Sequence, residues 1–219
     1  MQADKSSTEL TVTEAARRTQ IVAAAIETVA ELGYARASFA KIADRAGLSS
    51  TSRISYHFAG KDDLLRACVE EITGVATEFM RPRIDAAAGY AAKLRAYIES
   101  NLDLLVERPA HLRALVEILR NVRDAEDGLG EAALASRTRR FAEHLRAGQE
   151  AGEFGPFNPE VLALAITGAI DAFVGASHDS ASHDGTAPDD ANGGIDLRRA
   201  GTELADAFER AVLANGARR

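Results

Sequence analysis

Apolar residues recur along this chain at spacings of three and four positions, which is the period of an amphipathic helix. The first such face begins at Ile21 and ends at Leu32, and Gly33 follows it in the position where a left-handed residue often terminates a helix. No stretch shows the clean apolar–polar alternation of a half-buried strand. The pattern therefore predicts an all-α protein.

Capping and breaking residues divide the pattern into about nine helices, with three short ones clustered at the front. Ser38 and Ser49 are placed to cap two short helices, and a long helix begins near Lys61. Pro82 is expected to start or kink the following helix. That helix contains the apolar residues of 94–105, and the next begins at Pro109 and contains those of 112–119. Later helices are expected over about residues 129–151, 158–176 and 195–214. Residues 177–194 contain no large apolar side chain and are rich in Ser, Asp and Gly, so a flexible loop is expected there.

The composition is that of a folded chain with one domain, or with a small domain joined to a larger one. Hydrophobic residues make up 46% of the 219 positions, enough for a sizeable core. The single cysteine, Cys68, excludes a disulfide framework and a zinc site of the paired-cysteine type, and it fits a reducing compartment. The apolar stretches fall short of the ~20 residues that span a bilayer, and the N-terminus lacks the apolar core of a signal peptide. A cytoplasmic protein outside the membrane is therefore expected.

The charge is unevenly distributed along the chain. Residues 11–61 carry seven Lys or Arg and four acids, a net charge of +3, in a chain whose total is −7 and whose remainder is therefore −10. A basic front joined to an acidic remainder is expected when only one end of a protein meets phosphate.

Two short helices joined at Gly47 and Leu48 form a candidate helix-turn-helix. A helix that enters the major groove needs short hydrogen-bonding side chains and an arginine, and it avoids acids that would face phosphate. The second of the two helices and its flanks contain no acid and offer these polar side chains: Ser49, Ser50, Thr51, Ser52, Arg53, Ser55, Tyr56 and His57. The alternative for this Ser/Thr-rich run is a solvated loop.

A series of short motifs runs in order through residues 18–65: Gly33-Tyr34, Ile42-Ala43, Ala46-Gly47-Leu48-Ser49, Tyr56-His57-Phe58, Lys61 and Leu64-Leu65. This series resembles the N-terminal DNA-binding domain of TetR-family transcriptional regulators. One feature departs from the family, because the segment from Gly47 to Phe58 is one residue longer than the commonest pattern. An extra residue would rotate the following side chains by ~100° unless a bulge absorbs it.

The resemblance implies a regulator with an N-terminal tail (residues 1–12), a DNA-binding domain (13–60) and a helical ligand-binding and dimerisation domain (61–219). It implies a homodimer that binds a palindromic double-stranded operator, usually as a repressor, and is released by a small-molecule effector, with no cofactor. The expected DNA contacts are the eight residues of the second short helix and its flanks, together with Arg17, Arg18, Lys41 and Lys61. Within the second short helix and its flanks, Arg53 is the side chain able to bind guanine in bidentate fashion. Phe58 is expected to be structural, whereas Tyr56 is equally suited to the core and to a phosphate.

The last two helices each carry an apolar stripe that is expected to form the dimer interface, and the alternative is that both stripes are intramolecular core. The stripes consist of Leu162, Ile166, Ile170, Phe173, Leu197, Leu204, Phe208 and Val212.

An effector pocket requires apolar walls and a few convergent polar groups. The candidate lining residues are Phe79, Tyr97, Asn101, Leu104, Arg113, Glu117, Arg120, Phe141, His144 and Asp171. Each polar member is individually more consistent with a surface or helix-pairing charge than with a ligand contact. Asp171 lies in an otherwise uncharged helical stretch and is expected to pair with Arg120 or Arg113.

Two other classes of protein remain as alternatives, a helical adaptor that binds no DNA and a small helical enzyme. The chain contains no nucleophile-elbow, phosphate-loop, dinucleotide-binding or paired-histidine zinc motif, and Cys68 fits a small core residue. The repeated His178-Asp179 and His183-Asp184 pairs lie in the expected flexible loop, so no metal site is predicted there.

Overall fold

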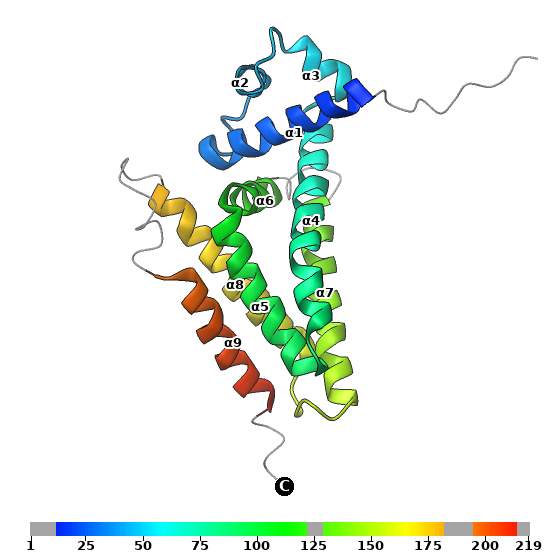
Figure 1. The fold of residues 1–219 in the computed structure, drawn as a ribbon, viewed down its shortest axis with the longest axis vertical. Helices are drawn as coiled ribbons and strands as arrows, with labels where there is room; N and C mark the ends of the chain where they lie inside the picture. The colour runs from blue at the N-terminus through cyan, green and yellow to red at the C-terminus, as the bar shows by residue number, and fades with distance from the viewer. Residues whose placement is uncertain (1–11, 122–128, 182–194, 214–219) are drawn as a thin grey trace, which may run out of the picture.

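The computed structural model describes residues 12–121, 129–181 and 195–213, and within them the chain forms nine helices and no strand (Figure 1). The helices are α1 (Val12–Leu32), α2 (Phe39–Arg45), α3 (Ser52–His57), α4 (Lys61–Ala86), α5 (Gly89–Glu107), α6 (Pro109–Asn121), α7 (Leu129–Glu150), α8 (Pro159–Ala181) and α9 (Leu197–Leu213). The predicted all-α class is confirmed. Residues 1–11 of the expected tail lie outside the described residues, and so do residues 182–194, which make up most of the expected loop.

Two helix boundaries differ from the prediction. Pro82 lies inside α4, which continues to Ala86, and the next helix begins only at Gly89. A proline removes one backbone hydrogen bond of a helix, and the chain turns instead at Gly89, whose φ of +83° favours glycine. α8 extends beyond residue 176 to Ala181.

Helices α1, α2 and α3 form a small unit, called the head below, at one end of the molecule (Figure 1). Its core contains Ile21, Ile42 and Ile54, all almost completely buried. Helix α4 closes this core from below, and Cys68 on its inner face donates a weak hydrogen bond to the carbonyl oxygen of Val22, with Sγ and O 3.9 Å apart. Burial raises the pKa of the Cys68 thiol to about 12. Cys68 is thus a core residue, as expected.

The core of the head continues into helix α6. Ala114 and Ile118 of α6 are buried in the same cluster as the apolar side chains of α1 and α4. Figure 1 shows α6 lying next to α1, between the head and the remaining helices. The head and the body, as helices α5–α9 are called below, therefore meet through packed side chains.

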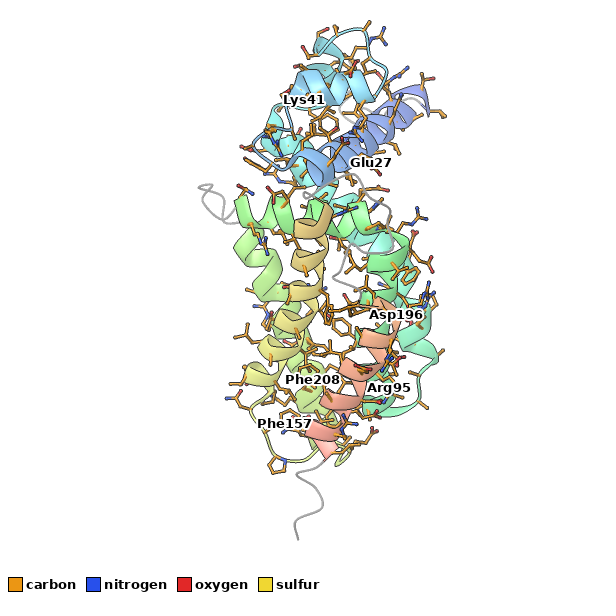
Figure 2. The ribbon with its side chains drawn as sticks, turned by 90° about the vertical axis from the view of Figure 1, so that its left-hand side faces the viewer. Glu27, Lys41, Arg95, Phe157, Asp196 and Phe208 are labelled. Carbon is orange, nitrogen blue, oxygen red and sulfur yellow. The ribbon has the colours of Figure 1, made fainter. Side chains whose placement is uncertain are left out.

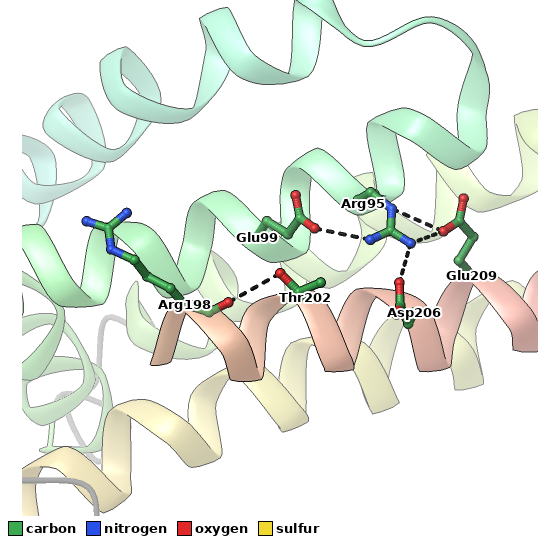
Figure 3. Close-up of polar contacts among 6 residues, drawn as sticks. All are labelled: Arg95, Glu99, Arg198, Thr202, Asp206 and Glu209. Atoms are coloured by element: carbon green, nitrogen blue, oxygen red, sulfur yellow. Dashed lines mark hydrogen bonds and ion pairs between the residues drawn. The ribbon is translucent and has the colours of Figure 1, made fainter. Parts of the chain in front are cut away.

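In the body, α9 lies along α5, and a charged cluster joins the two helices (Figure 3). The guanidinium of Arg95 on α5 forms ion pairs with Asp206 and Glu209 of α9, and the pair to Asp206 measures 2.5 Å. Gly201 permits the close approach, since a Cβ there would lie 3.2 Å from the Cβ of Leu102. Figure 2 shows that Arg95 lies in the part of the body farther from the head.

The apolar stripes predicted to form a dimer interface lie in or against the chain's own core. Ile166 and Val212 are 0% exposed and Ile170 is 3% exposed. The other members of the stripes pack against the same cluster: Leu162, Phe173, Leu197, Leu204 and Phe208. Ile166, Ile170 and Val212 therefore follow the alternative of an intramolecular core, because a fully covered side chain offers no surface to a second copy. The other five members are only partly buried, so their place in a dimer interface stays a prediction.

The opposite face of α8 is also apolar, but it is uncovered. Val161 and Leu164 are 64% and 66% exposed. Small exposed residues continue the same face: Ala165, Gly168 and Ala172. The window Pro159–Ala176 has a mean hydropathy of 1.5 and, by length and composition alone, could cross a membrane. The core of a soluble protein produces helices of the same composition, and the inner side of this one packs on α7.

Candidate nucleic-acid interface

The turn between α2 and α3 is held by backbone hydrogen bonds and by α1. Gly47 adopts a φ of +63°, and the N–H of Leu48 donates to the carbonyl oxygen of Ala43 at 2.8 Å. The side-chain amide of Gln20 on α1 donates to the carbonyl oxygen of Ala46 at 2.7 Å. These contacts fix α3 relative to α1, as a helix-turn-helix requires.

Helix α3 is amphipathic over only six residues. Ile54 and, directly after the helix, Phe58 point into the head and are 0% and 2% exposed. The surrounding residues are exposed: Ser49, Ser50, Thr51, Ser52, Arg53, Ser55 and Tyr56. His57 is half-buried. The structure thus gathers hydroxyl groups and one guanidinium on a protruding surface without an acid on α3, which is the chemistry that major-groove edges accept.

The N-cap of α3 is Thr51 and not Ser49, which corrects the predicted start of this helix. The Thr51 side chain makes no capping hydrogen bond, and its backbone is already helical, with φ −68° and ψ −20°. The N–H groups of Arg53 and Ile54 donate to carbonyl oxygens three residues earlier, at 3.4 and 3.0 Å. The additional residue of this chain is therefore taken up in a tight turn before α3, and Ile54 keeps its buried position.

Tyr56 lies at the edge of this surface and is 73% exposed. Its ring contacts the ring of His57 edge-on, with centroids 5.0 Å apart, and its hydroxyl donates to Oε1 of Glu14 on α1 at 3.1 Å. Phe58, in contrast, is buried, as expected. Tyr56 was expected to suit the core and a phosphate contact equally, and its exposure does not fit a place in the core.

The predicted flanking cations have different environments. Arg17 donates to a neutral amide of its own helix at 2.6 Å, and the guanidinium of Arg18 lies 4.8 Å from the centroid of the Phe58 ring. Lys41 and Arg53 are exposed, and neither side chain makes a hydrogen bond or ion pair with any residue in the described part of the chain. Lys41 and Arg53 are therefore the cations most available to phosphate or bases.

Lys61 begins α4, where the prediction placed it, but its side chain turns toward its own chain. The Nζ atom donates to the carbonyl oxygen of Tyr34 at 2.7 Å and lies 4.0 Å from the centroid of the Tyr34 ring. Burial lowers the pKa of the Lys61 ammonium. A phosphate contact would compete with this intramolecular position.

Four of the predicted pocket residues lie around one polar cluster in the body. Tyr97 stacks on Phe141, with ring centroids 4.5 Å apart, and burial raises the pKa of its phenol. Asn101 donates to the carbonyl oxygen of Tyr97 at 2.7 Å. Asp171 pairs with Arg137 at 2.7 Å, which corrects the expected pairing with Arg120 or Arg113.

Arg137 was not predicted from the sequence. It lies in a polar stretch of α7 where no periodicity distinguishes it from its charged neighbours, and its partner is 34 residues away in sequence. A contact of that kind depends on how α7 packs against α8, so a local pattern gives no signal for it.

The remaining predicted pocket residues are dispersed. Phe79 and Leu104 belong to a separate apolar cluster between α4, α5 and α6. His144 is within hydrogen-bond distance of the carbonyl oxygen of Tyr90, at 3.3 Å, and burial lowers the pKa of its imidazole. Arg120 extends toward α8, and Glu117 faces the head.

Arg113 has a buried Nε without a hydrogen-bond partner in the described residues. A cleft of about 440 Å³ lies elsewhere, between α1 and α4, and is lined by Arg18, Val22, Glu70, Glu71 and Glu78 among others. None of the predicted pocket residues lines it.

Among the described residues, no three His, Cys, Asp or Glu side chains are grouped as a metal site requires. The two His-Asp pairs considered as metal ligands lie outside the side chains that the structure describes: His178-Asp179 and His183-Asp184.

Two family models match the chain. The model of the bacterial regulatory proteins of the tetR family matches residues 21–68, and that of the tetracyclin repressor-like C-terminal domain matches residues 87–174. Curated relatives include the HTH-type transcriptional regulators BetI of Stenotrophomonas maltophilia, 38% identical over 91 residues, and of Escherichia coli, 36% identical over 89 residues. These matches cover 41% and 40% of this chain and 46% and 45% of the relatives, so the chain spans less than half the length of the curated relatives it matches.

Solved structures of similar fold extend over nearly the whole chain. A putative transcriptional regulator of Pseudomonas aeruginosa has a TM-score of 0.71 at 22% identity, with 94% of each chain covered. FadR of Bacillus subtilis, solved with stearoyl-CoA, has a TM-score of 0.70 at 22% identity, covering 89% of this chain and 98% of that chain. AibR, solved with isovaleryl coenzyme A and operator DNA, has a TM-score of 0.68 at 18% identity, with coverages of 91% and 99%. At these identities the likeness shows the fold.

Proposed function

This chain belongs to the TetR family of transcriptional regulators, and from that premise we propose that it is a repressor that binds a palindromic operator as a homodimer and leaves it when a small molecule binds. We assign DNA binding to residues 13–60 and ligand binding and dimerisation to residues 61–219, a division that the two family matches support. The proposal includes a cytoplasmic location and no enzymatic activity.

The observation that carries the proposal is the exposed, acid-free surface of α3 above the buried Ile54 and Phe58. The hydroxyl groups of this surface and the guanidinium of Arg53 match base edges and phosphates. A bidentate contact of Arg53 with guanine would contribute about 1–3 kcal/mol of discrimination between bases.

Dimerisation is proposed through the uncovered face of α8. Val161 and Leu164 are well exposed there, and the small residues that follow allow a second helix to approach closely. Packing of this face on its two-fold copy would bury it symmetrically. The two heads would then have to lie about 34–36 Å apart, one turn of DNA, to occupy both half-sites.

The effector is proposed to bind in the body near the cluster of Tyr97, Arg137 and Asp171. The Nε atoms of Arg113 and Arg137 are buried and have no partner among the residues that the structure describes, so they are donors suited to an acidic or carbonyl group. Because FadR and AibR of similar fold were solved with acyl-CoA molecules, acyl-CoA thioesters are the first effectors to test.

The test is fluorescence anisotropy of the pure protein with the DNA upstream of its own gene and with scrambled DNA, at low and near-physiological salt. We expect a specific fragment, from this region or selected from genomic fragments, to bind ~10³-fold more tightly than scrambled DNA, with a steep salt dependence. Arg53→Ala should weaken binding and relax the preference at one base of each half-site, whereas Arg139→Ala, an exposed arginine on α7, should change neither. Failure to bind any duplex, including selected genomic fragments, would contradict the proposal and favour an adaptor.

A further inference from the structure

We propose that Glu117 of α6 is a positioning residue through which the body fixes the orientation of the DNA-reading head. The inference rests on the proposed operator binding and adds to it the contact that sets the spacing of the two heads. It concerns a residue that the sequence placed among candidate effector contacts and that the structure places elsewhere.

The carboxylate of Glu117 meets the backbone where α1 ends. Its Oε1 accepts a hydrogen bond from the N–H of Tyr34 at 3.1 Å, and it lies 3.3 Å from the position that a Cβ on Gly33 would take. Gly33 has a φ of +78°, so the turn and the room for the carboxylate both depend on glycine. Asn121, one turn later on α6, donates to the same Oε1 at 3.3 Å and steadies it.

This hydrogen bond differs in kind from the apolar contacts between α6 and the head. Ala114 and Ile118 meet α1 through apolar side chains, which can slide with little directional preference. A charge-assisted hydrogen bond to a backbone N–H has a defined direction and length. Glu117 therefore sets the angle between the head and α6, whereas the apolar contacts hold the two together.

The same turn is held from a second side by Lys61 of α4. While Glu117 binds the N–H of Tyr34, the Lys61 ammonium binds the carbonyl oxygen of the same residue at 2.7 Å and lies over its ring. Tyr34 thus connects the end of α1, the start of α4 and the body. A shift of α6 would therefore move the turn at Tyr34, and with this turn the end of α1 and the start of α4.

The consequence concerns the distance between half-sites on DNA. A two-fold dimer binds both half-sites only when its recognition helices are about one DNA turn apart, ~34–36 Å. With the Glu117 contact intact, each head has a fixed orientation, and operators of altered spacing are penalised. Without it, each head can adjust, so the penalty should fall even though the surface that contacts DNA is unchanged.

The experiment compares affinity for three operators: the native one, one with a base pair added at its centre and one with a base pair removed. The proteins are the wild type, Glu117→Ala, Glu117→Asp, Glu117→Gln and the control Glu107→Ala, which removes the same charge from an exposed position at the end of α5. Thermal unfolding of each variant is followed in parallel.

For the wild type, Glu117→Gln and Glu107→Ala, we expect altered spacing to weaken binding about tenfold or more, a factor of ten being 1.4 kcal/mol. Gln keeps a carbonyl oxygen that can accept from Tyr34, so it should rescue the spacing preference. For Glu117→Ala the penalty should fall to about threefold, and Glu117→Asp should behave likewise because its side chain is one methylene too short to reach the turn.

An unchanged spacing penalty in a folded Glu117→Ala would overturn the inference, and if that variant fails to fold, Glu117→Asp decides in the same way. A uniform loss of affinity at all three spacings would assign Glu117 a purely structural role and would also overturn it. If the wild type itself binds no operator, the proposed function fails, which is a separate and distinguishable result.

Discussion

At the scale of single residues, the DNA-facing surface contains one contact that opposes DNA binding. The hydroxyl of Tyr56 donates to Glu14, and a hydroxyl has only one proton to donate. Tyr56 therefore cannot donate to a phosphate while it is bound to Glu14, and the carboxylate itself would repel a nearby phosphate.

Glu14→Gln keeps an acceptor for the Tyr56 hydroxyl but removes the charge that repels phosphate, so it should strengthen DNA binding. We expect operator affinity to rise about threefold to tenfold at low salt and less at high salt, since ions screen the removed charge. Glu27→Gln is the matched control, because Glu27 lies on the same helix at the end nearer the body, where it interacts electrostatically with His111 of α6 (Figure 2). Equal binding by Glu14→Gln at low salt would show that this carboxylate does not oppose DNA binding, and weaker binding would show that it supports the DNA-bound form.

Sequence reasoning succeeded at this scale where a role depends on local spacing. Ile54 and Phe58 are one helical turn apart, so their burial and the exposure of the residues between them follow from the helical period. It failed for the pairing of Asp171, whose partner Arg137 comes from another helix, and it did not foresee that the Lys61 side chain binds Tyr34, although the phosphate contact of Lys61 stays a prediction. Both outcomes depend on how helices pack, which residue types do not encode locally.

At the scale of elements, α9 is attached to α5 by charges as well as by apolar packing. Arg95 forms ion pairs with Glu99 on its own helix and with Asp206 and Glu209 on α9 (Figure 3). These hydrogen bonds raise the pKa of the Arg95 guanidinium. Without Arg95, three carboxylates would remain close together without a partner.

Arg95→Gln should therefore lower the free energy of unfolding by about 1 kcal/mol, more than an isolated surface pair contributes. The matched control is Arg199→Gln, which removes an exposed arginine that pairs with Glu203 within α9, and we expect no measurable change there. Urea unfolding monitored by circular dichroism measures both. Equal stability of the two variants would contradict a special role for the Arg95 cluster.

Helix periodicity predicted the number and order of these elements, but not which face of α8 is covered. That helix has large apolar residues on one side and Val161, Leu164 and small residues on the other, so both faces are compatible with a core or an interface. Two members of the stripe predicted to form the interface, Ile166 and Ile170, are buried in the body, whereas Leu162 and Phe173 are only partly buried. The choice depends on where α5, α7 and α9 lie, and a pattern within α8 does not contain that information.

At the scale of the whole molecule, charge and apolar surface are segregated. The basic segment forms the head and its junction with α4, whereas the acidic remainder of the sequence carries the uncovered face of α8. In the proposed function, such a molecule would approach DNA with the head and leave the uncovered face of α8 free for a second copy. A mutation on one of these two surfaces should therefore leave the other surface intact. Loss of dimerisation should lower operator affinity only because a monomer cannot occupy two half-sites.

Leu164→Glu should convert the proposed dimer into monomers in analytical ultracentrifugation, because it places a charge in the middle of the uncovered α8 face. Operator affinity should fall about a hundredfold or more, since two separate heads lose the benefit of being linked. Val106→Glu is the control, since Val106 is also an exposed apolar residue, 41% exposed, but lies on α5. A dimer that persists in Leu164→Glu would place the interface on another surface.

The burial of Cys68 gives this protein a built-in reporter of its own opening. Its Sγ lies beneath α1, and a thiol with a pKa of about 12 has almost no thiolate at neutral pH. An alkylating reagent can therefore modify it only when α1 separates from α4, and no second thiol of the chain competes for the reagent. The rate of labelling, measured with and without DNA or a candidate effector, would record how often the two helices separate, without any engineered label.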